Sequence, residues 1–234
     1  MTVRVRIELG AEGGRAAARR GDVVVVIDTL RASSTIVAAL ASGMRAVVPT
    51  TAAERCLSAD GVSAGERRGE KLAGFDHGNS PTEILRQGYR GRTLYLTTTN
   101  GTECIEVAAG GAEAVVVGCL LNARAAAEAA YRRASRAGRD LTLLTAGRQG
   151  GEAIEDTLSA TEMWRCLPGC PIGGAVLPHP SSDFLADLLA SPSGQDLLRL
   201  GYREDVELCA RKDLFDVVPV YRCGELMAGG TGWS

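Results

Sequence analysis

DVVVVIDTLRASST, residues 22–35, joins an apolar strand to the start of a helix. Residues 23–27 are an unbroken β-branched run, which is typical of a strand covered on both faces. A helix is predicted over residues 34–42, and Gly43 closes it. The polar turn between the two then lies at the carboxyl edge of a sheet, where open α/β sheets bind their ligands.

The same strand-then-helix spacing recurs along the chain and predicts a largely parallel sheet with helices on both faces. Strands are predicted over residues 3–9, 46–49, 92–97, 114–117 and 141–145, and helices over residues 51–58, 102–109, 123–137 and 152–166. The first strand, in which apolar and polar residues alternate, could be an antiparallel edge. No linker divides the chain, so residues 1–234 are expected to form one domain.

The pattern changes from about residue 170. Residues 171–180, PIGGAVLPHP, are predicted to be a loop. Short helices are expected over residues 183–189 and 194–200, and a last strand over residues 217–221. These short apolar helices cover either the sheet or a partner subunit, so a homo-oligomer is compatible with the sequence.

Composition excludes several classes of protein. The net charge is −2 with both signs dispersed, which argues against a nucleic-acid surface. No apolar run approaches the ~20 residues that cross a bilayer. The N-terminus, MTVRVRIELG, lacks the features of a signal peptide, and the seven cysteines form no CxxC pair. We therefore expect a cytoplasmic protein with reduced cysteines, no membrane contact and, with two histidines, no zinc site.

The turn after the 23–27 strand carries Asp28, Arg31, Ser33, Ser34 and Thr35. A helix start suits an anion, and the arginine adds a two-pronged donor for phosphate or sulfonate. Asp28 repels that anion unless a cation lies between them, which suggests Mg²⁺. Alternatively, either serine is a plain N-cap, and Asp28 and Arg31 form a surface pair.

Residues 60–81, DGVSAGERRGEKLAGFDHGNSP, form a long stretch of glycines and charges without hydrophobic period. A stretch this long in a compact domain is usually a functional loop or disordered. Glu66 is a candidate for metal binding or acid–base chemistry. Arg67, Arg68 and Lys71 are candidates for contact with an anionic ligand. The alternative is a solvated loop.

Two further polar turns follow predicted strands. TTTNGT, residues 97–102, offers hydroxyls and backbone N–H groups to an oxyanion, although Asn100 and Glu103 also resemble a capping box. In TAGRQGGEAIEDTLSA, residues 145–160, the spacing of Glu152, Glu155 and Asp156 places them on one helical face. Acids in a first turn are favoured by the helix dipole, but these also make a platform for Mg²⁺.

VIDTLRASST, GERRGEKLAGFDHGNSP, TTTNGT and AGRQGGEAIEDTL, in this order, resemble the motifs of the 2-phosphosulfolactate phosphatase family. The resemblance is strong over about residues 22–165 and weaker over the tail. It implies a three-layer α/β/α sandwich with a mixed sheet. It also implies a Mg²⁺-dependent phosphatase that converts 2-phospho-3-sulfolactate to sulfolactate, a step towards coenzyme M. A small anionic substrate with phosphate and sulfonate groups is the expected partner.

The resemblance also gives the candidate site residues. Asp28, Arg31 and Glu66 are expected to be catalytic, and Asp28, Glu155 and Asp156 to hold Mg²⁺. The candidates for binding the substrate are Ser33, Ser34, Thr35, Asn79, Ser80, Thr99, Asn100, Gly101, Thr102 and Gly147. The attacking group is either Asp28, which would give an aspartyl-phosphate, or water on the metal; we favour water, because a metal ligand is less free to attack.

Other functions stay open at this point. A non-catalytic binder of phosphorylated or sulfonated metabolites needs the anion site but no Mg²⁺. A phosphatase for a different small acid phosphate is a further alternative, because family membership fixes reaction type better than substrate. Residues 61–65, GVSAG, match the GxSxG string of serine hydrolases, with His179 as a distant partner. That string needs a strand before it and a helix after it, which this sequence does not predict.

Overall fold

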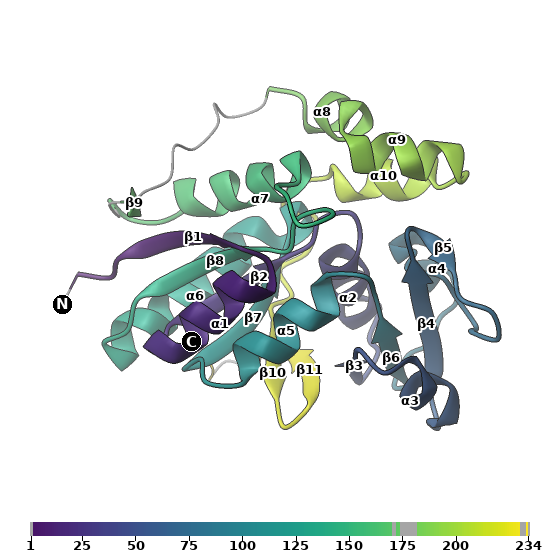
Figure 1. The fold of residues 1–234 in the computed structure, drawn as a ribbon, viewed down its shortest axis with the longest axis horizontal. Coiled ribbons are helices and arrows are strands. Elements are labelled where there is room, and N and C mark those ends of the chain that lie inside the picture. Colours follow the sequence, from purple (N-terminus) through teal and green to yellow (C-terminus); the bar gives the residue numbers. More distant parts are fainter. Residues whose placement is uncertain (1, 170–171, 174–181, 230–232, 234) are drawn as a thin grey trace.

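The structure is a computed structural model that describes residues 2–169, 172–173, 182–229 and 233 (Figure 1). Within these residues, eleven strands form one sheet in the order β5-β4-β6-β3-β11-β10-β7-β2-β8-β1-β9. The strands are β1 Val5–Leu9, β2 Val23–Ile27, β3 Ala46–Pro49, β4 Val62–Arg67, β5 Glu70–Lys71, β6 Thr93–Thr97, β7 Ala114–Gly118, β8 Leu141–Thr145, β9 Ile172–Gly173, β10 Pro219–Arg222 and β11 Glu225–Ala228. The helices are α1 Gly10–Arg20, α2 Ala32–Ala41, α3 Ala53–Ser58, α4 Pro81–Arg86, α5 Gly101–Ala109, α6 Ala123–Ala137, α7 Ile154–Arg165, α8 Phe184–Ala190, α9 Pro192–Arg199 and α10 Arg203–Cys209, with a 3-10 turn, η1, at Leu120–Asn122.

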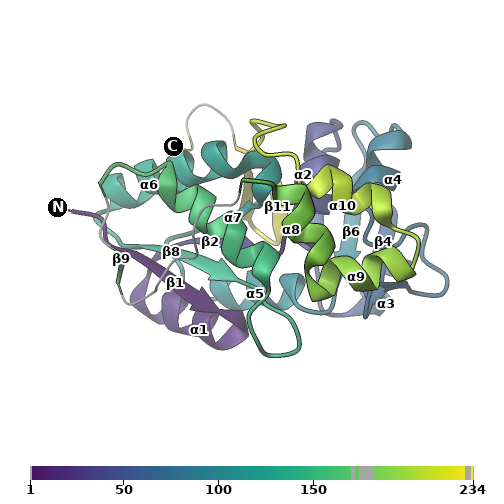
Figure 2. The ribbon, with the colours of Figure 1, turned by 90° about the horizontal axis from the view of Figure 1, so that it is seen from above.

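Strand β2 divides its side chains between two cores. Val24 and Val26 pack with residues of α1, α2 and α5, whereas Val23, Val25 and Ile27 pack with α6 and α7. Successive side chains of a strand point to opposite faces, so an unbroken apolar run needs a helical layer on each side. The fold is therefore a three-layer α/β/α sandwich with a mixed, largely parallel sheet, as the sequence predicts (Figures 1 and 2).

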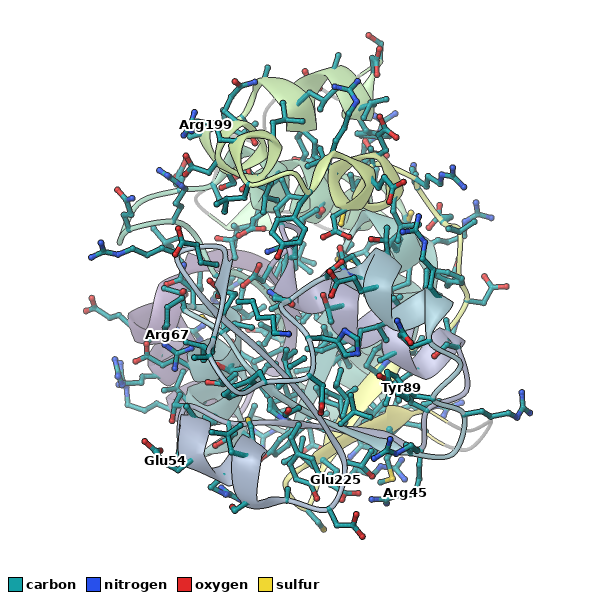
Figure 3. The ribbon with its side chains drawn as sticks, turned by 90° about the vertical axis from the view of Figure 1, so that its right-hand side faces the viewer. Arg45, Glu54, Arg67, Tyr89, Arg199 and Glu225 are labelled. Atoms are coloured by element: carbon teal, nitrogen blue, oxygen red, sulfur yellow. The ribbon has the colours of Figure 1, made fainter. Side chains whose placement is uncertain are left out.

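The antiparallel part of the sheet is not where we expected it. Strand β1 pairs in parallel with β8 and β9, so the prediction of an antiparallel first strand is wrong. Two adjacent strands from the tail, β10 and β11, run antiparallel instead and bridge β7 and β3. At the outer end of this junction Arg45 and Glu225 form an ion pair of 3.2 Å (Figure 3).

Several elements are absent from the sequence prediction. Helix α1 packs against α5, and β4 lies inside the stretch predicted to be a long loop, where it pairs in parallel with β6. Residues 81–86 and 203–209 form the unpredicted short helices α4 and α10. The GVSAG string runs into β4 and is not a strand-to-helix turn, because Ser63 is in the strand and bonds to Asp76 Oδ2 at 2.9 Å. This excludes the serine-hydrolase reading; His179 lies outside the described residues.

The helices of the tail pack on other helices of the chain. Helices α8, α9 and α10 pack together and against α7 and α4, and Figure 2 shows α9 and α10 above β6 and β4. The predicted loop over residues 171–180 lies outside the described residues except for Ile172–Gly173, which is strand β9. Among the described residues, no helix has both the length and the apolar character needed to span a bilayer.

Leu226→Ala tests whether the β10–β11 pair is an integral part of the core. Leu226 is fully buried and pairs with Val47, so we expect the substitution to lower the free energy of unfolding by about 2–5 kcal/mol. Chemical denaturation measures this change. Leu214→Ala, at a side chain that is 43% exposed, is the matched control and should have little effect. Equal effects of the two substitutions would contradict the packing described here.

Candidate active site

A cavity of about 830 Å³ opens at the carboxyl ends of β2, β4, β6 and β8. Its wall is built from the turn after β2, the β4–β5 turn, the start of α5, the glycine-rich loop after β8, the start of α7 and helix α9. Segments from both halves of the chain therefore meet here. The volume suits a small molecule together with its water.

Asp28 lies where α2 and α5 begin. Its Oδ1 accepts a hydrogen bond from the N–H of Ala32 at 3.1 Å, so Asp28 caps α2. A side chain at Gly101 would come within 2.6 Å of Asp28 Oδ2, which shows why the start of α5 needs glycine here. Burial, together with the charges of Glu66 and Glu155, raises the pKa of Asp28 to about 7, against the lowering effect of the backbone N–H groups of Ala32 and Gly101.

Glu155 and Asp156 lie buried at the start of α7. Asp156 accepts hydrogen bonds from the N–H groups of Thr29 at 2.7 Å and Gly147 at 3.0 Å, which ties the Asp28 turn to the glycine-rich loop. Its pKa is raised by burial, with the charges of Asp28 and Glu155 adding to the effect. Oε2 of Glu155 is buried without a hydrogen-bond partner.

The prediction that Glu152 shares a helical face with these acids is wrong. Helix α7 begins at Ile154, so Glu152 precedes it, and its side chain is exposed. The glycines before it lengthen the turn, and helical spacing does not apply there.

Glu66 joins two of the loops that border the cavity. It accepts hydrogen bonds from the N–H of Thr99 at 2.8 Å and from the N–H of Gly69 at 2.7 Å. The hydroxyl of Thr99 donates to the same carboxylate at 3.0 Å. Glu66 thus holds the β4–β5 turn against the loop before α5.

Arg31 lines the cavity but does not stand free in it. Its Nη1 donates to Asp205 Oδ2 at 2.7 Å and its Nη2 donates to the carbonyl of Gly69 at 3.1 Å. The guanidinium lies 4.1 Å from the ring centre of Tyr202. The surface pair between Arg31 and Asp28 that the sequence left open is not formed.

Amides and a glycine complete the polar wall. Asn100 does not cap α5; its Nδ2 donates to the carbonyl of Gly147 at 3.0 Å, so the capping box is not formed. Asn79 lines the cavity with a buried Oδ1 that has no hydrogen-bond partner. Gly147 has a φ of +72°, and a side chain there would collide with the carbonyl of Gly151.

Other predicted substrate-binding residues are not brought to the cavity wall. The hydroxyls of Ser33 and Ser34 donate to the carbonyls of Val26 and Thr29, and that of Thr102 donates to the carbonyl of Thr98. Ser80 caps α4 and donates to Asp205. The cavity wall therefore includes Thr99, Asn79, Asn100 and Gly147 but omits Ser33, Ser34, Thr35, Ser80, Gly101 and Thr102.

Sequence reasoning missed the contribution of the tail. Helix α9 borders the cavity with Ser193, Asp196, Leu197, Arg199 and the following Leu200. Asp196 forms ion pairs with Arg148 of the glycine-rich loop and with Arg199, which is labelled on the upper helices in Figure 3. No motif marks these residues, because short amphipathic helices look alike whether they cover a core or a cavity.

The donor set suits Mg²⁺ better than a caged metal. Across the described residues, no three His, Cys, Asp or Glu side chains form a ready-made metal site. Mg²⁺ needs fewer protein ligands, since it usually binds one or two carboxylates, and water and substrate phosphates fill its other coordination positions. Asp28, Glu155 and Asp156 offer carboxylates, and Glu155 Oε2 and Asn79 Oδ1 are buried oxygens without a hydrogen-bond partner.

Comparison with known proteins agrees with this geometry. The sequence pattern of the family described as 2-phosphosulpholactate phosphatase matches residues 12–224. The chain is 36% identical over 233 residues to the 2-phosphosulfolactate phosphatase of Methanothermobacter thermautotrophicus, covering 97% of this chain and 96% of that protein. It is 35% identical over 219 residues (86% and 88%) to a probable 2-phosphosulfolactate phosphatase of Caldanaerobacter subterraneus, and 37% identical over 204 residues (83% and 87%) to one of Thermotoga petrophila.

The match spans the strand–turn–helix units that line the cavity and extends into the helical tail. All four polar turns that carry Asp28, Glu66, Asn100 and Glu155 lie within it. The chain belongs to the 2-phosphosulfolactate phosphatase family.

Proposed function

We propose that this protein is a Mg²⁺-dependent phosphatase that hydrolyses 2-phospho-3-sulfolactate to 3-sulfolactate and phosphate. The observation that carries the proposal is the set of carboxylates in the cavity wall, of which Glu155 keeps a buried oxygen without a partner. Carboxylates grouped in this way repel a phosphate monoester and attract a divalent cation. Membership of the family supports the reaction and the substrate.

Asp28, Glu155 and Asp156 are the proposed residues for holding Mg²⁺, with Asn79 Oδ1 as a further oxygen ligand. Bound there, the ion would neutralise phosphate charge and so supply much of the electrostatic stabilisation that phosphoryl transfer needs. Each of these side chains lies at the end of a strand or near the start of a helix, which is the kind of support that a preorganised site needs.

The remaining residues bind and orient the ester. Arg31 offers its N–H groups to a phosphate or sulfonate oxygen, and Asn100 and Thr99 border the same space. Both carboxylate oxygens of Asp28 face backbone N–H groups, those of Ala32 and Gly101, which makes Asp28 a weak nucleophile. Water is therefore the proposed attacking group.

The direct test is phosphate release from a set of small monoesters, measured with Mg²⁺ and again with EDTA. We expect Mg²⁺-dependent turnover that is fastest with 2-phospho-3-sulfolactate. Preference for 2-phospholactate would move the assignment to a different small acid phosphate. Binding of these esters without release of phosphate would show that the protein is a metabolite-binding protein and not an enzyme.

Asp28→Asn should reduce kcat by on the order of 10³-fold or more, because it removes a charge at the metal and at the reacting phosphate. Steady-state kinetics at saturating Mg²⁺ measures the loss. Asp60→Asn is the matched control, since Asp60 is an exposed acid away from the cavity, and should leave kcat unchanged. Full activity in the Asp28 variant would remove this residue from the site.

The raised pKa of Asp28 predicts how stability depends on pH. The folded protein holds this proton up to about pH 7, whereas the unfolded chain releases it near 3.8, so stability without metal falls as the pH rises between these values. The loss is at most about 1.4 kcal/mol per pH unit for one group. Asp28 would bind Mg²⁺ in its deprotonated form, so the rise in Tm on adding Mg²⁺ should be larger at about pH 8 than at about pH 5.

Thermal melts of the wild type and of Asp28→Asn, each with and without Mg²⁺, measure this effect. The variant should show a flatter dependence of Tm on pH and a smaller effect of Mg²⁺. The same Mg²⁺ shift at both pH values in the wild type would show that the ion does not displace this proton.

A further inference from the structure

Arg31 is held by residues that lie far along the chain. Its side chain is 2% exposed and sits between the carboxylate of Asp205, the carbonyl of Gly69 and the ring of Tyr202. An arginine has five N–H groups, of which these two hydrogen bonds use one on each terminal nitrogen. The others are available to the cavity that Arg31 lines.

Asp205 is itself fixed on its other side. While Oδ2 receives Arg31, Oδ1 accepts hydrogen bonds from the hydroxyl of Ser80 at 2.8 Å and from the N–H of Thr82 at 3.1 Å. The hydroxyl of Thr82 donates to the same oxygen at 2.5 Å. The side chain of Asp205 is 1% exposed, so a carboxylate from α10 is locked against the start of α4 and holds an arginine from the turn before α2.

The contacts with Asp205 and Tyr202 fix the position of the Arg31 guanidinium. The same cavity contains the carboxylates of Asp28, Glu66 and Glu155, which attract a guanidinium. A free Arg31 would be drawn towards these acids and would occupy the space in which a cation and a phosphate have to meet. The pair with Asp205 and the stacking on Tyr202 keep it at the wall.

We propose that Asp205 is a positioning residue for the reaction: it aims the guanidinium of Arg31 at the anionic substrate and keeps it away from the metal-binding acids. The inference rests on the proposed function, because it gives Arg31 an anion to bind. It makes helix α10 a part of the active site. A misplacement of about 1 Å in a group that orients a substrate costs about 100-fold in rate.

The test compares Asp205→Asn, Arg31→Lys and the double variant. Asp205→Asn keeps the shape of the side chain but removes the charge that holds Arg31. We expect kcat/KM to fall by roughly 30- to 100-fold in each single variant, and the double variant to be no worse than Arg31→Lys, because residues that act through one another are not additive. Glu204→Gln is the matched control: it is the preceding residue of α10, with an exposed ion pair to Arg86, and should change kcat/KM little.

A second readout does not need turnover. The dissociation constant of inorganic phosphate, measured by calorimetry with Mg²⁺ present, should rise by at least about tenfold in Asp205→Asn and stay unchanged in Glu204→Gln. Circular dichroism at the assay temperature establishes that each variant is folded. If Asp205→Asn does not fold, Tyr202→Leu is used in its place. This variant keeps the buried ion pair of Arg31 but removes the stacking of its guanidinium on Tyr202. We expect it to weaken phosphate binding by several-fold.

The outcomes separate the two proposals. Phosphate binding that depends on Asp205, in a protein that hydrolyses no ester, would overturn the proposed function and support the role of Asp205. Normal phosphate affinity and normal kcat/KM in a folded Asp205→Asn protein, with only Tm lowered, would leave Asp205 a purely structural residue. Losses that multiply in the double variant would show that Asp205 does not act through Arg31.

Discussion

The burial of carboxylates around one cavity, at the ends of strands, is the constraint on which the site depends. Removing a carboxylate from water is costly unless donors replace the water. Here backbone N–H groups do so: those of Thr29 and Gly147 for Asp156, and those of Thr99 and Gly69 for Glu66. Each of these acids therefore ties two loops together. The carboxylates that hold the loops in place also line the cavity.

Much of the sheet was predictable because its strands are buried on both faces and so read as apolar runs. The missed elements are made of small residues. In α1, side chains at Gly13 and Gly14 would collide with Glu8 and Val107, so the helix packs closely without an apolar stripe. Strand β4 is similar, since any side chain at Gly65 would meet Thr97. Hydrophobic periodicity detects elements with large apolar side chains. It misses elements that pack closely because glycine stands at the contact.

For the site, the sequence predicted which turns meet but not where their side chains point. Asp28 and Glu155 follow β2 and β8, two neighbouring parallel strands, so the convergence of these two acids follows from the strand pattern. Glu66 and Asn100 come from the half of the sheet beyond the antiparallel β10–β11 pair, so their approach to Asp28 does not follow from it. The hydroxyls of Ser33 and Ser34 turn inward because Asp28 itself occupies the start of α2, the place in which a phosphate was expected. The partner of Arg31 lies 174 positions away, and no spacing rule connects residues so distant.

This site differs from phosphate sites that rely on an unpaired arginine, because Arg31 is paired with a buried carboxylate. Asp205 pairs with Arg31, the buried arginine of the wall, so Arg31 does not neutralise the carboxylates of the same cavity. Arg68, Arg148 and Arg199 line the same cavity and are less buried than Arg31, and the last two also pair with Asp196. These arginines would attract a substrate with two or more acidic groups, and in the proposed function a cation beside the carboxylates would hold its phosphate. In the proposed reaction, the dependence on metal is thus set by the protein's own charges, at the step of substrate binding as well as in the chemistry.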